Sequence, residues 1–443
     1  MKHSKSYVSA VVLTVGAMAL AACSSGSSGT ASTSAAPATS EAPAASAAAS
    51  AAGAAYTPTG PVLVDADVTA GKVDLKGQKV VALFTSLNND YYAGWARGAE
   101  AAVKAFNGEY VGQVNEGDAA TQISQFEQAI DQGAKIIFIT APDPANIPTM
   151  AKLATEKGVC LANTWEEPPW TSPFDYGDGY AAYLTNSSVA AGYDVAKALF
   201  DKMGGKGNVV HLTGHPGSTP DTQRTEGFDL ALKEYPDIKL VAREAGEWNR
   251  DDARKVMAGI LSKTDGDVQG VFGQNDDVGV GAMNALQEAG ITGVPITGID
   301  GNAGTMDLIK AGTYYGAFTT FPFWNSGFSM VQAMDWCLGV RTSPLNRQLW
   351  TGGQLITADT VDKYQATFLG DSLPYDWQLM SRAAHPTDWD PQGGVSALEM
   401  DKMWSSVPQP DGYTLPKEYS DALPDLPVVN AEWADHWKIN YMQ

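Results

Sequence analysis

The chain has 443 residues, of which 44% are hydrophobic and 18% are charged, so it is long enough for two or three domains with sizeable cores. Its formal net charge of −21 argues against nucleic acid and anionic lipid surfaces as partners, because an acidic surface repels both. The charge does not by itself select any other ligand.

The N-terminal residues have the features of an export signal. Lys2 and Lys5 precede the apolar segment YVSAVVLTVGAMAL, which is too short to span a membrane and is followed by Cys23 in the sequence LAAC. This ending resembles the bacterial lipobox, which implies lipidation of Cys23; a plain secretory signal with an unrelated cysteine is the alternative. Residues 24–60 are rich in Ser, Ala, Gly and Pro and predict a disordered tether. We therefore expect an extracytoplasmic protein anchored to the cell membrane by lipid, in the periplasm or on the outer face.

Two further cysteines, Cys160 and Cys337, lie in apolar surroundings. In an exported protein they form either a disulfide or two buried free thiols, and the sequence leaves both alternatives open. The spacing of Cys and His is not typical of a zinc site. His211 and His215 are expected on a strand and its following loop rather than on one helix face, so we predict no metal and no cofactor.

From residue 79 onward, short apolar runs alternate with helical patterns. This alternation predicts parallel sheets covered by helices on both faces, since the near-continuous apolar strands are typical of burial on two sides. The expected strands are 79–85, 109–114, 134–140, 158–163, 207–213, 238–244, 268–274, 294–300 and 314–320. The clearest helical patterns are 120–132, 221–235, 250–263 and 276–290.

The alternation breaks at 163–188, which is aromatic, Pro-rich and irregular, and it stops after about residue 350. We interpret this as two similar doubly wound α/β lobes joined by crossing segments. The expected boundaries are 79–185 plus 321–348 for the N-terminal lobe and 186–320 plus 349–364 for the C-terminal lobe. The remainder, 365–443, carries five tryptophans and is expected to be an ordered extension of loops and short helices, because disordered tails are poor in aromatic residues.

Several motifs in order resemble one family. The segments ALFTSLNNDYYAGWARGAE, TQRTEGFDLAL, GVFGQNDDVGVGAMNALQEAG and ITGIDG are similar to those of type 1 periplasmic sugar-binding proteins of ABC importers, the ribose-binding-protein-like family. GGQLITADTVDKY is similar to the last hinge strand of that family, so the resemblance covers roughly 79–364. It implies a monomeric receptor, not an enzyme, whose two lobes close on a small sugar. It also implies delivery to the membrane subunits of an ABC permease.

The resemblance also suggests positions that contact the solute. In the first lobe it implies an amide at Asn89 and two aromatic rings at Tyr91 and Tyr92. In the second lobe it implies an arginine that reaches into the cleft at Arg224 and a stacking ring at Trp248. It also implies an amide and a carboxylate that hold hydroxyls at Asn275 and Asp300. Thr320 falls where a glutamine is common. The chemistry suits a sugar, because planar Arg, Asp and Asn groups can each hold two neighbouring hydroxyls. Aromatic rings cover the apolar C–H face of the sugar.

Each of these positions also has a structural alternative: helix-start packing for the two tyrosines, a solvated helix face for Arg224, core packing for Trp248, a helix cap for Asn275 and a turn for Asp300. We expect Asp276 or Asp277 to cap the helix and Asn275 to point into the cleft. The solute-binding interpretation is favoured because all these residues fall at carboxyl ends of predicted strands, where open parallel sheets bind ligands.

One segment departs from the family pattern. Many relatives carry an adjacent Asp-Arg pair after the fourth strand, whereas this chain has Asn163, Thr164 and Trp165. An amide and a ring in place of a charged pair disfavour ribose and suit another pyranose, a polyol or a cyclitol. We count Asn163 and Trp165 as solute-binding residues and expect the loop 165–180 to fold over the cleft mouth.

Other functions fit less well. A sensory receptor for a membrane kinase or chemoreceptor, or a receptor for a nucleoside or another small polar solute, would use the same fold, and the sequence does not separate them. A transcription regulator is excluded because no helix-turn-helix pattern precedes residue 79. A hydrolase lacks support because GHPGS is not a G-x-S-x-G elbow. The glycines of 278–282 lie inside a helical pattern and lack dinucleotide-loop spacing.

Overall fold

The structure is a computed structural model that describes residues 56–443. The predicted export signal, Cys23 and most of the predicted tether lie outside the described residues. Within the described part of the chain, no helix combines the length and apolar character needed to cross a membrane.

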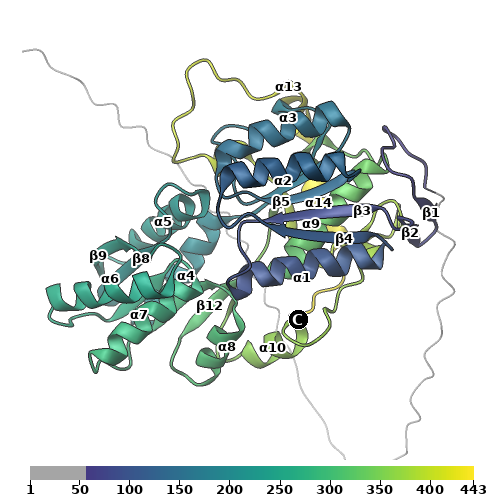
Figure 1. Cartoon of the computed structure of the whole chain (residues 1–443). Coiled ribbons are helices and arrows are strands. Elements are labelled where there is room, and N and C mark those ends of the chain that lie inside the picture. Colours follow the sequence, from purple (N-terminus) through teal and green to yellow (C-terminus); the bar gives the residue numbers. More distant parts are fainter. Residues whose placement is uncertain (1–55) are drawn as a thin grey trace, which may run out of the picture. The chain divides into compact units, whose positions relative to one another are not determined.

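Two mixed sheets, each mostly parallel, organise the described residues, as expected for a two-lobed α/β fold (Figure 1). The first sheet has the order β15 (Val395–Ala397), β13 (Gln348–Thr351), β7 (Tyr180–Asn186), β6 (Cys160–Thr164), β5 (Ile136–Thr140), β3 (Lys79–Phe84) and β4 (Glu109–Val114). The second has the order β14 (Gln354–Ile356), β12 (Gly316–Thr319), β11 (Ile296–Asp300), β10 (Gly270–Gly273), β8 (Lys206–Thr213) and β9 (Asp237–Ala245). Only β15 and β14, at one edge of each sheet, run antiparallel to their neighbours.

Helices cover both faces of each sheet. On the first sheet, α1 (Asp90–Ala105) and α9 (Pro322–Cys337) pack together on one face, and α2 (Ala119–Asp131) and α3 (Ile147–Lys157) pack on the other. On the second sheet, α4 (Ser188–Lys202) and α5 (Thr219–Leu232) pack together opposite α6 (Arg250–Lys263) and α7 (Asp276–Glu288), with α8 (Ala303–Lys310) beside β12. The central strands are therefore buried on two sides, and every residue of β5 and β10 is buried.

The chain crosses between the lobes three times. It crosses after β7, after β12 and between β13 and β14. Most strand memberships agree with the lobe boundaries given above, which we retain as a proposal. The exceptions are Asn186, in β7, and residues 349–351, in β13, because they belong to the first sheet although the boundaries place them in the C-terminal lobe. Strand β7 lies inside the segment 163–188 that the sequence pattern marked as irregular. A hairpin of β1 (Asp67–Thr69) and β2 (Lys72–Asp74) precedes the first lobe.

The C-terminal extension is ordered and packs on the first lobe. After α10 (Val361–Phe368) it contains α11 (Trp377–Met380), β15, α12 (Met400–Met403), α13 (Lys417–Ala422) and α14 (Leu426–His436). Strand β15 pairs with β13, and the indole of Trp433 donates to Asn346 Oδ1 over 2.8 Å. The extension also touches the second lobe, where Gln223 Nε2 donates to Met403 O over 3.1 Å.

Cys160 and Cys337 form a disulfide, which resolves the alternative that the sequence left open. The bond ties β6 to the last residue of α9 and closes a loop between residues 177 positions apart. Both cysteines are fully buried.

We expect the Cys160→Ala/Cys337→Ala double variant to lose about 2–4 kcal/mol of unfolding free energy, because removing the cross-link frees a long loop in the unfolded chain. Chemical denaturation of the variant and of the oxidised parent measures this difference. Reductant should shift the parent toward the variant and leave the variant unchanged; equal midpoints for both proteins would contradict the expectation.

Candidate functional site

A cavity of about 610 Å³ lies where the carboxyl ends of strands from both lobes meet, and we call it the cleft pocket. Eight of the ten residues that the sequence suggested as solute-binding line it: Asn89, Tyr91, Tyr92, Trp165, Arg224, Trp248, Asn275 and Asp300. The first four come from the first lobe and the last four from the second. The structure thus brings together residues separated by more than 200 positions in the chain.

Aromatic rings form the first-lobe wall of the cleft pocket. Tyr91 and Tyr92 open α1, with ring centroids 5.7 Å apart, and the Trp165 ring lies 6.2 Å from that of Tyr91. Asn89 caps α1 through Oδ1, which accepts from the backbone N–H of Tyr92 over 2.9 Å. Because the cap uses only the oxygen, the amide NH₂ of Asn89 remains able to donate to a ligand.

Arg224 lines the cleft pocket between rings of both lobes. Its guanidinium lies 5.8 Å from the ring of Trp165 and 5.5 Å from the ring of Trp248, so aromatic side chains of both lobes contact one cation. Nη1 donates to Gln274 O over 2.6 Å, while the buried Nε has no partner among the described residues. Burial lowers the pKa of Arg224, and the nearby Asp300 opposes that shift. The side chain is therefore almost fully buried beside the cavity and keeps donor capacity that no protein group uses.

A close helix contact places Arg224. A side chain at Gly227 would meet the backbone oxygen of Val189 at 2.1 Å, so only glycine lets α5 lie this near α4. A similar requirement applies at Gly214, where a Cβ would lie 1.9 Å from the indole of Trp248. Small residues thus make room for the arginine and the ring that the ligand would meet.

Asp300 ends β11 and is almost fully buried. Burial, and then the neighbouring charge of Asp276, raise the pKa of Asp300 well above its ordinary value, while Arg224 lowers it. Asp276 holds the turn that follows β11, since Oδ2 accepts from the backbone N–H of Gly301 and Asn302 over 3.0 and 2.8 Å. The carboxylate of Asp300 is therefore positioned by its neighbours and remains available to ligand hydroxyls.

The expected helix cap was assigned to the wrong residue. Asn275, rather than Asp276 or Asp277, caps α7, and its Oδ1 accepts from Val278 N over 2.8 Å. Asp277 instead forms an ion pair with Arg250. Asn275 lines the cleft pocket as well, so the cap and the cleft position are compatible, as they are at Asn89.

Two predicted residues do not line the cleft pocket. Asn163 is fully buried, and its Nδ2 donates to Glu166 O, Glu167 Oε2 and Tyr180 OH over 2.7, 3.2 and 2.8 Å. Thr320 is also fully buried, with its hydroxyl 3.2 Å from that of Tyr91. The Nδ2 of Asn163 and the hydroxyl of Thr320 contact protein groups behind the wall, whereas Oδ1 of Asn163 has no partner among the described residues. A direct contact of either residue with the solute stays a prediction.

The structure adds charged residues that sequence reasoning missed. Glu166 lines the cleft pocket from the first lobe, and Oε2 accepts from Thr219 Oγ1 over 3.1 Å at the start of α5 in the second lobe. Burial raises the pKa of Glu166 to about 7. His215 and Glu247 form a hydrogen bond with each other and also line the pocket. The sequence offered one signal for Glu166 as a cleft residue: it follows Trp165 directly, in the loop that we expected to fold over the cleft.

The backbone of the site adopts sparsely populated conformations. Trp165, Glu247 and Trp248 have φ values of 68°, 56° and 53°, and Asp300 has a φ of 150°. Such conformations at non-glycine residues destabilise a chain by about 1–3 kcal/mol each and cluster at functional sites. Four of them around one cavity indicate that each lobe holds the backbone of its own part of the site in a fixed conformation.

Glu167, behind the wall, predicts a pH dependence of stability. It is buried and accepts hydrogen bonds from Tyr180 OH and Thr171 Oγ1 over 2.6 and 2.8 Å, and burial raises its pKa from 4.5 to about 7. A carboxyl with a raised folded-state pKa contributes stability below its unfolded pKa and loses it as the pH rises through the folded pKa. Between pH 4.5 and about 7, Glu167 therefore lowers the free energy of unfolding by about 3 kcal/mol, at about 1.36 kcal/mol per pH unit.

We therefore expect Glu167→Gln to flatten the fall in melting temperature between pH 4.5 and 7, because the amide stays neutral throughout. Melting curves across this range, with the exposed Glu109→Gln as control, test the expectation. Parallel curves for the parent and Glu167→Gln would rule it out.

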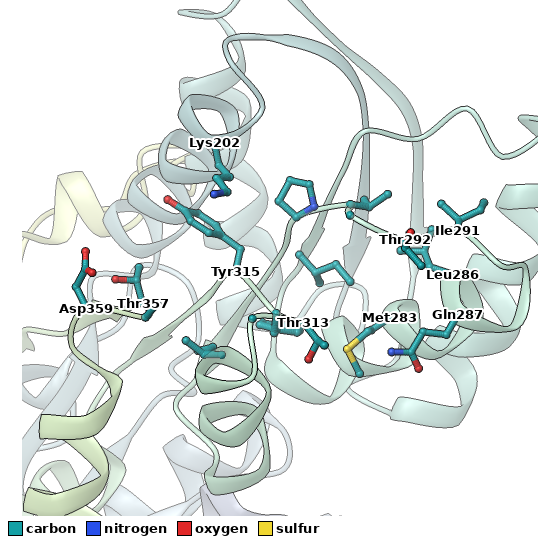
Figure 2. Close-up of a pocket in the computed structure, with 18 residues that line it drawn as sticks. Lys202, Met283, Leu286, Gln287, Ile291, Thr292, Thr313, Tyr315, Thr357 and Asp359 are labelled. Atoms are coloured by element: carbon teal, nitrogen blue, oxygen red, sulfur yellow. The ribbon is translucent and has the colours of Figure 1, made fainter.

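A second hollow of about 530 Å³ lies on the second lobe (Figure 2). It shares no lining residue with the cleft pocket. Its lining includes the apolar side chains of Met283 and Leu286, and Lys202 lies over the ring of Tyr315 at 5.3 Å. None of the predicted solute-binding residues lines it. The convergence of planar polar groups and rings therefore selects the cleft pocket as the candidate site.

Comparison with known proteins gives a consistent result. Residues 80–337 match the model of a family described as periplasmic binding protein domain. The chain is 36% identical over 221 residues to a xylitol-binding protein of Mycolicibacterium smegmatis, covering 49% of this chain and 61% of that protein. It is 27% identical to the D-allose-binding periplasmic protein of Escherichia coli, covering 51% of this chain and 74% of that protein.

Solved structures show the same architecture. A twin-arginine translocation pathway signal protein from Burkholderia phytofirmans aligns with a TM-score of 0.63 at 27% identity, covering 67% of this chain and 95% of that one. A Caulobacter myo-inositol binding protein bound to myo-inositol aligns with a TM-score of 0.58 at 22% identity, covering 65% and 95%. At that identity the likeness supports the fold alone. The aligned shares leave about a third of this chain unmatched.

Proposed function

The chain belongs to the periplasmic binding protein family, and we propose that it is the extracytoplasmic solute receptor of an ABC importer for a neutral polyol or monosaccharide. The observation that carries this proposal is the cleft pocket itself. Arg224 and Asp300 are buried together there, between aromatic rings contributed by both lobes.

The charges of the cleft pocket favour a neutral solute. Its lining includes the carboxyl groups of Asp143, Glu166, Glu247 and Asp300 and a single arginine, Arg224. A sugar acid would bring a further negative charge next to these carboxyl groups, which is unfavourable unless that charge is paired. A polyol pairs its hydroxyls with Arg224, Asp300 and the amides of Asn89 and Asn275. The name of the xylitol-binding relative supports this class of solute.

Function follows from contacts with both lobes. A solute that touches Tyr91 and Trp165 on one side and Arg224 and Asp300 on the other binds the closed arrangement better than an open one. It therefore shifts the population toward closure by that difference in affinity. We propose that the membrane subunits of a permease read the closed form, that the monomer is lipid-anchored through Cys23 and that the protein performs no catalysis. A sensory receptor that passes the closed form to a kinase or chemoreceptor is the alternative.

A thermal-shift screen tests the proposal. The purified protein is melted with xylitol, ribitol, arabitol, ribose, allose, myo-inositol, a sugar acid and adenosine. A ligand at a thousand times its dissociation constant should add about 4 kcal/mol to the folded state. A large shift with a neutral polyol or sugar and none with the acid is the expected result. A shift with adenosine alone would keep the fold and overturn the solute class.

A further inference from the structure

A third cavity, of about 320 Å³, lies where the crossing segments meet the C-terminal extension, and we call it the hinge pocket. Phe321 and the pair Gly352 and Gly353 belong to two of the three crossings. The extension supplies Trp437 and Tyr441. None of these residues lines the cleft pocket, so the two cavities are separate.

Both lobes contribute walls to the hinge pocket. Gln354 begins β14 of the second sheet, and Phe368 ends α10, which packs against α8 of the second lobe. Gly394 directly precedes β15, which pairs with β13 of the first sheet. A rotation of one lobe against the other must therefore change the shape of this cavity, because its walls move with different lobes.

The backbone at the crossing is already constrained. Phe321 has a φ of 52°, an uncommon conformation for a bulky residue, and its ring packs on those of Tyr364 and Phe368 with centroids 6.2 and 5.2 Å apart. Asn186, at the crossing that follows β7, donates to Thr351 O and Gly352 O over 2.9 and 3.2 Å. The cavity thus adjoins the crossing segments, and connecting segments of this kind absorb the change in backbone angles in hinge motions.

The lining defines the chemistry of a ligand. It contains six aromatic side chains, the amides of Gln354, Gln392 and Asn440, and glycine backbone, and it includes no Asp, Glu, Lys, Arg or His. Gln392 is already engaged, since Oε1 accepts from Tyr441 OH and from Asp376 N over 2.8 and 3.0 Å. A sugar with many hydroxyls would leave several of them unpaired here, whereas a neutral ring with one polar group would not.

We propose that the hinge pocket is an effector site for a small neutral ring compound, and that its occupation changes the affinity of the cleft pocket for the solute. A ligand that fills a cavity shaped by both lobes favours one arrangement of them. By thermodynamic linkage, the ligand of the hinge pocket changes the affinity for the solute by the same factor by which the solute changes the affinity for that ligand. The effect on solute affinity rests on the proposed function, but binding to the hinge pocket does not.

Indole serves as the probe in an experiment on the full chain. We expect millimolar indole to raise the melting temperature of the parent and of Asp300→Ala alike, and to change the Kd of the solute for the parent at least threefold. Trp437→Ala should lose both effects, because it removes a ring of the hinge pocket that is 38% exposed and so is tolerated by the fold. Val428→Ala, on α14 and 70% exposed, is the matched control and should keep both effects. Gln354→Ala gives a second variant on the opposite wall, expected to weaken indole binding.

Each other outcome overturns the proposal. No shift with indole in the parent, or an equal shift in Trp437→Ala, would show that the hinge pocket does not bind it. A shift lost in Asp300→Ala would place indole in the cleft pocket. An unchanged solute Kd in saturating indole would refute the coupling. If the solute screen fails, binding of indole to the hinge pocket is still tested, because the shift that indole causes in Asp300→Ala does not depend on any solute.

Discussion

Replacing Asp300 by alanine is expected to weaken solute binding about a thousandfold, about 4 kcal/mol, as measured by titration calorimetry. The carboxylate is buried at the end of β11 and can accept from two neighbouring hydroxyls, and each hydrogen bond to a charged group contributes about 1.5–3 kcal/mol. Its loss also leaves Arg224 in the cleft pocket without the charge that opposes its desolvation.

The same change should alter the stability of the empty protein little, because two effects oppose each other. Burial raises the pKa of Asp300, so removing the group relieves the cost of burying its charged form, but it also removes the charge that offsets the desolvation of Arg224. We expect the melting temperature without ligand to stay close to that of the parent. Asp277→Ala is the control, since Asp277 is on the neighbouring helix α7 and pairs with Arg250. Equal solute affinities for the two variants would contradict the assigned role of Asp300.

Deleting residues 365–443 is expected to prevent the first lobe from folding to a soluble form. The extension buries Trp377, Trp389, Trp404 and Trp433, each 5% exposed or less. Truncating one buried tryptophan to alanine typically costs about 3–5 kcal/mol, and the four together exceed about 10 kcal/mol. That is comparable with the whole stability of a typical domain, about 5–15 kcal/mol. The deletion also uncovers the edge of β13, which β15 normally pairs.

Soluble yield and melting temperature measure this prediction. Trp433→Ala and Trp437→Ala form a matched pair, because Trp433 lies in α14 and is 1% exposed, whereas Trp437 follows directly after α14 and is 38% exposed. The first should lose several kcal/mol and the second less than about 1.5 kcal/mol. A soluble truncated protein that melts like the parent would rule out a structural role for the extension.

Local patterns predicted the alternating elements and most of the cleft pocket. The strand-helix alternation identified the two sheets because both strands and helices carry their burial pattern in consecutive residues. Tyr91, Arg224 and Asp300 were found because the carboxyl ends of parallel strands gather at one edge. The sequence did not reveal Glu166, whose partner Thr219 is 53 positions away. It also left the pairing of Cys160 with Cys337 open.

Other misses have similar physical causes. Strand β7 lies in a Pro-rich segment without a clear period, and β15 is three residues long, with its partner β13 more than forty positions earlier. Asn163 and Thr320 fell at the right ends of strands, but they form hydrogen bonds with buried neighbours and do not line the cavity. Strand position alone does not distinguish a side chain in the wall from one behind it.

The two lobes differ in how much of the chain each needs. The second lobe takes nearly all of its strands and helices from one continuous stretch, 188–319, and only β14 and α10 are added later. The first lobe needs 79–186, then 322–351 and finally β15 and α14 near the chain's end. A chain that emerges from its N-terminus during synthesis or export can therefore complete the second lobe while the first still waits for its last strand. The first lobe therefore starts to emerge before the second lobe but completes its sheet after it. Until β15 pairs with β13, the exposed edge of β13 must be protected from pairing with other chains.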